Sequence, residues 1–267
     1  MPIPEGTTLA AVPGVLAAKV AAYNTTVGAT YNPPYADYIA VRKSGIATTG
    51  SLSAWLASDG AASVQSLLKA FGMNLRTSKL IAPVGFQGVL SALGPATVNW
   101  VADLALPLTA PPANLVSSAT GETLSAELRL LYNVFAEPGS VTESGGYVAA
   151  SKTMHCLFPE LAPMIDGRHS GISYYNIDRV TYVPPLGILS WETWVGERVG
   201  RVPNPSPRGD GRYEWKWQNF VAAVGVNQRI YELWQLAHGN PGLKAFLALD
   251  PTPGTTGIPR IIDKGLW

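Results

Sequence analysis

Several titratable side chains gather in one stretch of this sequence, residues 143–173, which reads ESGGYVAASKTMHCLFPELAPMIDGRHSGIS. Lys152 and His155 fall in its apolar helical part, and Asp166, Arg168 and His169 follow a proline-bounded turn. Asp166 closes the apolar run PMI, whose side chains favour burial, so we expect its carboxylate to be partly shielded from water. A half-buried carboxylate beside arginine and histidine is typical of sites that carry out chemistry.

Each of these side chains also has a structural interpretation. Asp166 is suited to be the N-cap of the next helix, where its carboxylate accepts backbone N–H hydrogen bonds. His155 and His169 either orient water or contact a phosphate, or they are satisfied, partly buried histidines. The residue types alone leave these alternatives open.

The hydrophobic pattern predicts an all-α fold. Apolar residues recur at helical spacing, and no alternating pattern of useful length indicates strands. The first helix is expected to start at Thr7 or Thr8 and to break near Pro13-Gly14, and the segment NPPY at 32–35 is expected to be a turn. Further helices are expected at 51–58, 61–72, 86–93, 96–106, 121–136, 190–198, 212–238 and 241–249, and the apolar tail 257–267 is expected to dock on the body.

The length of 267 residues suits one large domain, or two smaller lobes that share a cleft. A hydrophobic content of 47% and a charged content of 14% indicate a compact globular protein and exclude a disordered one. The Pro-rich loop LTAPPAN at 108–114 is the best candidate for a boundary. We therefore expect a single helical domain over 1–267, with possible lobes 1–110 and 111–267 flanking a cleft.

The formal net charge of +1 restricts the ways in which this protein can bind nucleic acid. Proteins that grip duplex DNA usually carry a basic surplus, because neutralising phosphates supplies most of their affinity. A DNA contact here must come from a local patch. The densest positive cluster lies at 198–216 and includes Arg201 and Arg208, although its acidic neighbours also suit a solvated loop.

Cysteine and histidine content argues against a metal centre. Cys156 is the single cysteine and lies in an apolar run, which favours a buried packing thiol over a nucleophile. With three histidines in the chain we expect no metal and no cofactor. The first residues lack the basic start and unbroken apolar core of a signal peptide, and the uncharged run 80–102 is interrupted by proline, glycine and asparagine. We expect a cytoplasmic monomer with no membrane partner.

The segment Gly145-Gly146-Tyr147, followed by a helix and by PMIDGRH at 163–169, resembles the helix-hairpin-helix DNA glycosylase superfamily. In that family a glycine-containing hairpin opens a helix, and an aspartate follows the last hairpin glycine at a separation like that of Gly146 and Asp166. The run PMIDG looks like the adenine-mispair branch. SKTMH at 151–155 with PELAPMID at 159–166 is also similar to bacterial proteins assigned a glycosylase-like fold, of the 8-oxoguanine and adenine-mispair type.

The resemblance implies a DNA partner and assigns roles to particular residues. Hairpin glycines let backbone N–H groups approach a DNA phosphate at a helix N-terminus. Asp166 would stabilise the positive charge that develops on the sugar as the base departs. The residues implied in DNA contact are Gly145, Gly146, Tyr147, His155, Arg168 and His169, with Arg201 and Arg208 as a second phosphate contact.

Two further expectations follow from the resemblance. Val148 takes the place where lyase-competent members carry a Schiff-base lysine, which implies a monofunctional enzyme. Lys152 lies one helical turn further on, as a displaced catalytic amine or as a surface or phosphate-contacting lysine. The target base would be flipped into a pocket lined by aromatic rings, of which Tyr147, Tyr174 and Tyr175 are nearest in sequence.

The resemblance therefore implies a DNA glycosylase of base excision repair, a hydrolase that cleaves the N-glycosidic bond of a damaged or modified base. Ser144 stands where the family usually has glycine. Together with the small net charge, this departure favours an alternative, a non-catalytic nucleic-acid-binding or phage-defence module with the same fold. A third alternative is an unrelated helical protein in which Asp166 only caps a helix.

Overall fold

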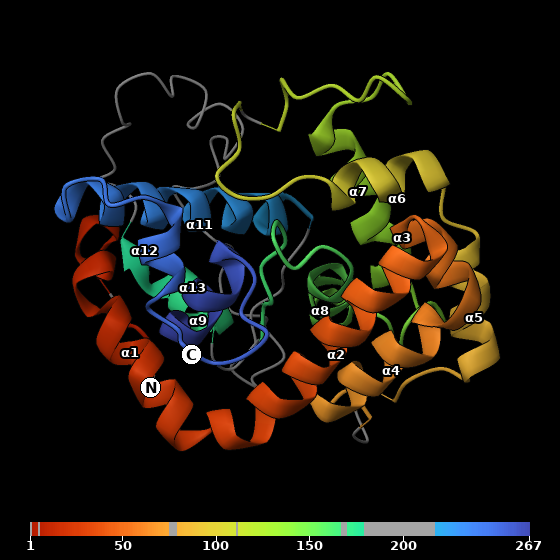
Figure 1. Ribbon diagram of the computed structural model, residues 1–267, viewed down its shortest axis with the longest axis horizontal. Coiled ribbons are helices and arrows are strands. Elements are labelled where there is room, and N and C mark those ends of the chain that lie inside the picture. The colour runs from red at the N-terminus through yellow and green to blue at the C-terminus, as the bar shows by residue number, and fades with distance from the viewer. Residues whose placement is uncertain (1, 5, 75–78, 111, 167–169, 179–216) are drawn as a thin grey trace.

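The computed structural model describes residues 2–4, 6–74, 79–110, 112–166, 170–178 and 217–267. Within these residues the protein is built almost wholly of helices (Figure 1). The strands described there are β1 (Thr7–Thr8) and β2 (Ile177–Asp178), which form one parallel pair. The expected all-α class is confirmed.

The helices are short and follow one another closely along the chain. They are η1 (Leu9–Ala11), α1 (Val12–Thr26), α2 (Gly28–Thr49), α3 (Leu52–Trp55), the π-helical turn η2 (Leu56–Gly60), α4 (Ala61–Ala70), α5 (Pro83–Ser91), α6 (Pro95–Ala102), α7 (Leu124–Ala136), α8 (Tyr147–Leu157), α9 (Ser170–Asn176), α11 (Trp217–Ala237), α12 (Leu243–Leu247) and α13 (Ile258–Leu266).

Helix α13 lies in the interior, between helices that come from opposite ends of the sequence. It packs against α1 and α11, and α9 lies beside it (Figure 1). Every residue of α13 is buried. The expected docking of the apolar tail is therefore confirmed.

Helix α2 connects α1 to a second group of helices. It packs on α1, α3 and α4, and α8 packs against both α4 and α7 (Figure 1). Because α1, α11 and α13 lie together, the two ends of the described chain share one core. A division into lobes at residue 110 stays a prediction. Among the described residues, no helix combines the length and apolarity needed to cross a bilayer.

Two expectations about prolines are wrong. The first helix does not break near Pro13-Gly14, because α1 begins at Val12 and Pro13 lies in its first turn. A proline there loses no intrahelical hydrogen bond, and its fixed φ suits the start of a helix. Pro13 therefore starts the helix that it was expected to interrupt.

The expected turn at 32–35 lies instead inside α2, which contains Pro33 and Pro34. Their missing N–H groups leave the carbonyls of Ala29 and Thr30 without the usual helical partner. Both of those residues are exposed, so the two carbonyls are accessible to water and their lost helical bonds cost little. Tyr35 is buried on the opposite side, and its packing holds the helix in place.

Other predicted helices agree with the structure. The range 61–72 matches α4, and its apolar face is buried. The range 121–136 matches α7, where the Thr123 side chain caps the helix by accepting the Ala126 N–H. Residues 212–238 overlap α11, and 190–198 lie outside the described residues. The predicted apolar faces of α4 and α11 are buried at Val64, Leu67, Leu68, Phe71, Phe220, Val221, Val224, Tyr231 and Trp234.

A buried carboxylate fixes the segment that leads into α13. Asp250 accepts hydrogen bonds from Lys264 Nζ at 2.5 Å and from the hydroxyls of Thr252 and Thr255 at 2.7 and 2.6 Å. The amide of Asn24 on α1 donates to the same carboxylate at 3.0 Å. Burial alone raises the pKa of Asp250, but these hydrogen bonds outweigh it and lower the pKa to about 2.

We predict that Asp250→Asn lowers the free energy of unfolding by about 3 kcal/mol at pH 7, because Lys264 loses its counter-charge in the interior. The folded-state pKa of Asp250 lies below the ordinary value of 3.8, so its stabilisation is complete above that pH and is lost as the pH falls toward 2. Urea denaturation should therefore show a smaller difference between variant and wild type at pH 3 than at pH 7.

The control for this experiment is Asp37→Asn, which changes an exposed aspartate on α2. We expect it to alter the free energy of unfolding by less than about 0.5 kcal/mol. Equal losses in the two variants would contradict a stabilising role for the Asp250 cluster.

Candidate active site

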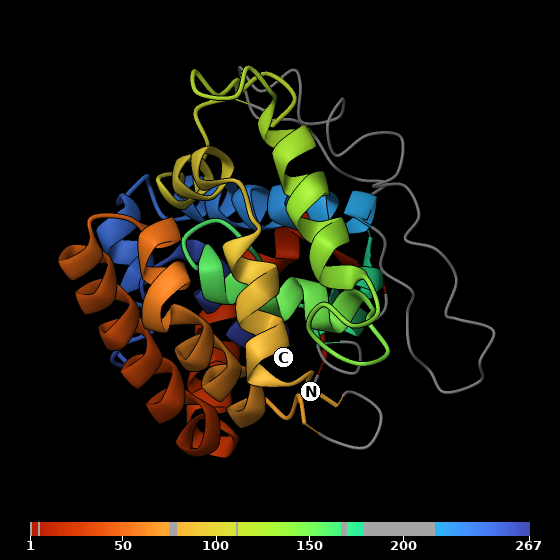
Figure 2. The same ribbon diagram turned by 90° about the vertical axis from the view of Figure 1, so that its right-hand side faces the viewer.

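The hairpin between α7 and α8 sets the start of the helix that carries Lys152 (Figure 2). Gly145 and Gly146 have φ angles of +66° and +112°, a region that favours glycine. A Cβ at Gly145 would lie 2.4 Å from the carbonyl oxygen of Ala136, so a larger residue would force the hairpin away from α7. Glycine therefore lets the chain turn closely against the end of α7 and enter α8.

The two hairpin amides implied in phosphate binding form hydrogen bonds inside the hairpin. The Gly145 N–H donates to the Thr142 carbonyl at 3.3 Å, and the Gly146 N–H donates to the Ala136 carbonyl at 2.8 Å. Gly146 is the N-cap of α8, so no side chain caps the first N–H groups of this helix. Half-buried Tyr147 begins the first turn, whose N–H groups carry the positive end of the helix dipole.

Lys152 is not a surface residue. Its side chain is 6% exposed, and its Nζ donates a hydrogen bond to the carbonyl of Phe71 at 3.0 Å. The same Nζ lies 3.3 Å from Oδ2 of Asp166. The structure thus brings together the two residues that the sequence selected as catalytic candidates.

Two serines hold the segment that presents Asp166. The hydroxyl of Ser151 on α8 donates to the Ile165 carbonyl at 3.0 Å and accepts the Ile165 N–H at 3.3 Å. Ser170 on α9 accepts the Asp166 N–H at 2.9 Å and donates to the Met164 carbonyl at 3.1 Å. Sequence reasoning gave neither serine a positioning role, although Ser151 adjoins Lys152 in the SKTMH segment.

The Lys152–Asp166 pair is asymmetric in its exposure to solvent. The Asp166 side chain is 21% exposed, whereas the lysine behind it is 6% exposed. The carboxylate is therefore the part of the pair that an approaching molecule meets. An ion pair at this depth is less screened by water and salt than a surface pair.

His155 is fully buried, and both of its ring nitrogens are engaged. Its Nδ1 lies 2.7 Å from the Ala162 carbonyl, which only accepts, so Nδ1 carries the proton. Its Nε2 therefore accepts from the Tyr35 hydroxyl at 3.0 Å. Burial lowers the pKa of His155 to about 3 and keeps the ring neutral. This geometry favours the structural interpretation of His155, because a phosphate contact would require it to leave these partners.

The remaining candidates divide into two groups. Arg168, His169, Arg201 and Arg208 lie outside the described residues, so their proposed DNA contacts stay predictions. Cys156 is fully buried on α8, and burial raises the pKa of its thiol to about 12. A thiol that stays protonated is not a nucleophile, which agrees with the expected packing role.

Phe71, whose backbone carbonyl accepts a hydrogen bond from Lys152, belongs to a row of aromatic rings that we call the aromatic row. The ring of Phe71, whose carbonyl binds Lys152, lies 6.0 Å from the ring of Tyr31 and 6.2 Å from that of Tyr35. Tyr31 in turn lies 5.7 Å from Trp267, and these two rings are only partly buried. Sequence reasoning missed this row, because its members are far apart in the chain. Phe71 was predicted to be a core residue on the apolar face of the helix at 61–72.

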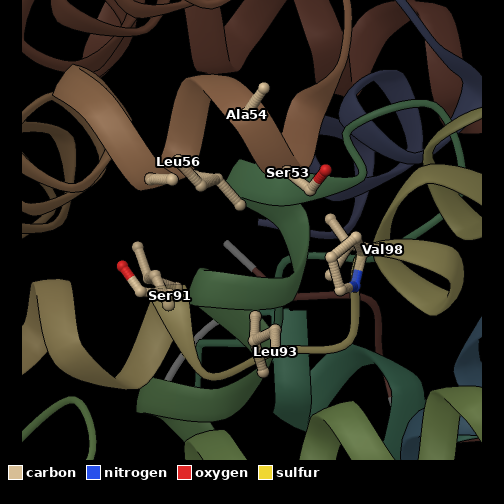
Figure 3. A pocket seen from close by; sticks show the side chains of 9 residues that line it. Ser53, Ala54, Leu56, Ser91, Leu93 and Val98 are labelled. Carbon is tan, nitrogen blue, oxygen red and sulfur yellow. The ribbon is translucent and has the colours of Figure 1, made fainter.

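A small cavity of about 190 Å³ lies elsewhere in the molecule, between α3, α5 and α6 (Figure 3). Apolar side chains and two serines line it, and it shares no residue with the Lys152–Asp166 pair. Its lining consists of Ser53, Ala54, Leu56, Ala57, Leu90, Ser91, Leu93, Pro95 and Val98. In the part of the chain that is described, no three histidine, cysteine, aspartate or glutamate side chains form a group suited to a metal ion.

Comparisons with protein-family models, with curated proteins and with solved structures found no match to this chain. The glycosylase resemblance therefore depends on the residues of the 143–173 stretch.

We predict that His155 makes the stability of the protein fall in mild acid. Its folded-state pKa of about 3 lies below the ordinary 6.5, so between these values the unfolded chain binds more protons and stability falls as the pH drops. The contribution amounts to about 1.4 kcal/mol per pH unit at most. His155→Gln removes it, so the stability difference between wild type and variant should shrink from pH 7 to pH 4.

His238→Gln is the matched control, because His238 is exposed near the end of α11. Denaturant titrations over the same pH range should show a larger shrinkage of the stability difference for His155→Gln than for this control. A constant difference for His155→Gln would show that the buried ring does not titrate as its environment implies.

Proposed function

We propose that this protein is a monofunctional DNA glycosylase that hydrolyses the N-glycosidic bond of a damaged or modified base, with Asp166 as its essential carboxylate. The observation that carries the proposal is the Lys152–Asp166 pair, with its Nζ to Oδ2 distance of 3.3 Å and its partly exposed acid. The glycine-led helix α8 and the segment held by Ser151 supply the fixed geometry. The resemblance to the helix-hairpin-helix glycosylases supplies the reaction class.

In this reaction the bond between the sugar C1′ and the base nitrogen breaks, and its electron pair leaves with the base. The oxygen of a water molecule bonds to C1′, one of its protons passes to the Asp166 carboxylate, and the base takes up a proton from solvent. Positive charge develops on the sugar between these events. A carboxylate fixed in a shielded site stabilises that charge far better than one in bulk water.

Lys152 acts in this proposal by holding Asp166. Its ammonium donates to the Phe71 carbonyl and faces the Asp166 carboxylate. An ammonium group has no free electron pair, so it cannot attack the sugar to form an imine. This arrangement supports hydrolysis without lyase activity, in agreement with the apolar Val148 at the position of the family's Schiff-base lysine.

The aromatic row supports a planar substrate. Phe71 connects Lys152 to Tyr31, and Tyr31 and Trp267 expose part of their rings. Enzymes that act on a base in DNA extrude it from the duplex and stack it on apolar or aromatic side chains. The partly exposed rings of Tyr31 and Trp267 give an extruded base an aromatic surface on which to lie.

One observation favours the alternative of a non-catalytic nucleic-acid-binding module. The Gly145 and Gly146 amides are bonded inside the hairpin, and the net charge is only +1, so the phosphate contacts implied by the resemblance are weakened. Duplex binding by the wild type without release of any base would support this alternative.

We predict that Asp166→Asn lowers the rate of base release by about 100-fold or more, because the amide cannot offset the charge on the sugar. Abasic sites formed in duplexes with a panel of modified bases measure this rate. Asp37→Asn, with its exposed side chain, is the matched control and should keep wild-type activity. Undiminished release by Asp166→Asn, with an unchanged circular dichroism spectrum, would falsify the assignment.

We also predict that borohydride traps no covalent protein–DNA adduct with the wild type, since Lys152 is held as a hydrogen-bonded ammonium. Denaturing gel electrophoresis of the reduced reaction detects such an adduct. An adduct that forms with the wild type and disappears in Lys152→Met would instead make Lys152 the nucleophile of a lyase.

A further inference from the structure

Asp263 is a buried acid that sequence reasoning did not select. It lies on α13, its side chain is 1% exposed, and its Oδ2 accepts from Arg260 Nη1 at 3.0 Å. Its other oxygen, Oδ1, has no hydrogen-bond partner within the described residues. A buried carboxylate oxygen without a partner is costly, so its retention calls for an explanation.

Helix α9 joins α13 to the segment that carries Asp166. Ser170 at the start of α9 accepts the Asp166 N–H, and Ser173, further along the same helix, donates to the Leu266 carbonyl on α13. The two helices pack against each other. The negative charge of Asp166 and the positive charge of Lys152 both act on the buried carboxylate of Asp263.

We propose that Asp263 is a positioning residue of the Lys152–Asp166 site, which acts through space on both charges and adds a second negative charge behind the reacting sugar. Its role in the reaction rests on the function proposed above, whereas its action on the two charges does not. Asp263 does not touch the substrate in this proposal. It changes the electrostatic potential that Asp166 presents.

The charges around Asp263 shift its pKa in opposite directions. Burial raises the pKa of Asp263 to about 6, against the lowering effect of Arg260 beside it. The negative charge of Asp166 raises this pKa further, and the positive charges of Lys152 and Lys264 lower it. Asp263 therefore changes its ionisation near pH 6 and responds to the state of the site.

The described residues of the other helices that pack on α13 also carry titratable groups. Tyr23 on α1 and Tyr174 on α9 interact with Asp263, but burial raises the pKa of Tyr23 to about 12 and that of Tyr174 well above its usual value. On α11, Arg229 pairs with Glu232 at 3.3 Å. Lys244 on α12 is exposed.

Ionised Asp263 has a defined effect on the proposed reaction. It attracts the positive charge that develops on the sugar, so base release is faster than with a neutral group. Protonation below pH 6 removes this effect. The rate of base release should therefore rise as the pH increases through about 6.

The first test measures the titration of the Asp263 carboxyl by carbon NMR in protein labelled at aspartate, and it needs no substrate. Asp166→Asn should lower the pKa of Asp263, and Lys152→Met should raise it, each by about 1 unit. Glu127→Gln is the matched control, because Glu127 is a buried carboxylate on α7 that binds the hydroxyls of Thr97 and Thr120. A titration of Asp263 that does not move in Asp166→Asn overturns the proposal.

The second test compares pH–rate profiles of base release by the wild type and Asp263→Asn. The asparagine oxygen can still accept from Arg260, so the variant removes the charge and keeps the hydrogen bond. We expect the rise near pH 6 in the wild type and its loss in the variant, with a several-fold lower rate at pH 8. A rise that persists in the variant overturns the proposal.

The two tests separate the inference from the proposed function. If the wild type releases no base from any duplex, the proposed function fails, and the titration still decides whether Asp263 acts on Asp166. If the wild type is active but the titration and the profile are both unchanged by the substitutions, the inference about Asp263 fails alone.

Discussion

Charges buried in the interior of this protein must be paired, and this constraint organises the fold. Arg260, Asp263 and Lys264 of α13 are each 1% exposed. An unpaired charge at that depth destabilises a protein by several kcal/mol, so each of these charges requires a partner. Lys264 forms an ion pair with Asp250, and Arg260 forms one with Asp263. The guanidinium of Arg260 also lies 4.5 Å from the ring centre of Tyr35 on α2. The paired charges thus fix α13 against the first two helices.

The candidate active site contains a further ion pair, which reaches the surface. Lys152 is buried, while Asp166 reaches solvent with about a fifth of its side chain. Ser151 and Ser170 fix the backbone on either side of this carboxylate, so its position does not depend on a flexible side chain alone. Preorganised charge of this kind is what an enzyme needs to stabilise a cation without rearranging at the moment of reaction.

The helical hairpin and the Asp166 carboxylate contribute differently to the proposed function: the hairpin orients a helix, and the carboxylate takes part in the chemistry. The Gly146 N–H donates to Ala136 at the end of α7 and the Gly145 N–H donates to Thr142 in the hairpin, so the clearest contribution of the two glycines is to orient α8. The Lys152–Asp166 pair and the aromatic row are the features that suit chemistry on a nucleoside. In the proposed function, the DNA contacts are therefore assigned to the first turn of α8 and to basic residues outside the described part of the chain.

The sequence by itself determined the helical class, the start of α8 and the selection of Lys152 and Asp166. These features depend on local patterns, namely helical periodicity, glycine at positive φ and a carboxylate after an apolar run. Local patterns misjudged Pro13 and the two prolines of α2. A helix tolerates Pro13 because it lies in the first turn, and it tolerates Pro33 and Pro34 where the carbonyls that lose their partners are exposed. Only the tertiary structure decided that His155 is neutral and enclosed, that Tyr31, Phe71 and Trp267 form one row, and that Asp263 lies within electrostatic reach of Asp166. These relations join residues distant in sequence, and their energies depend on burial and distance, which the order of residues does not specify.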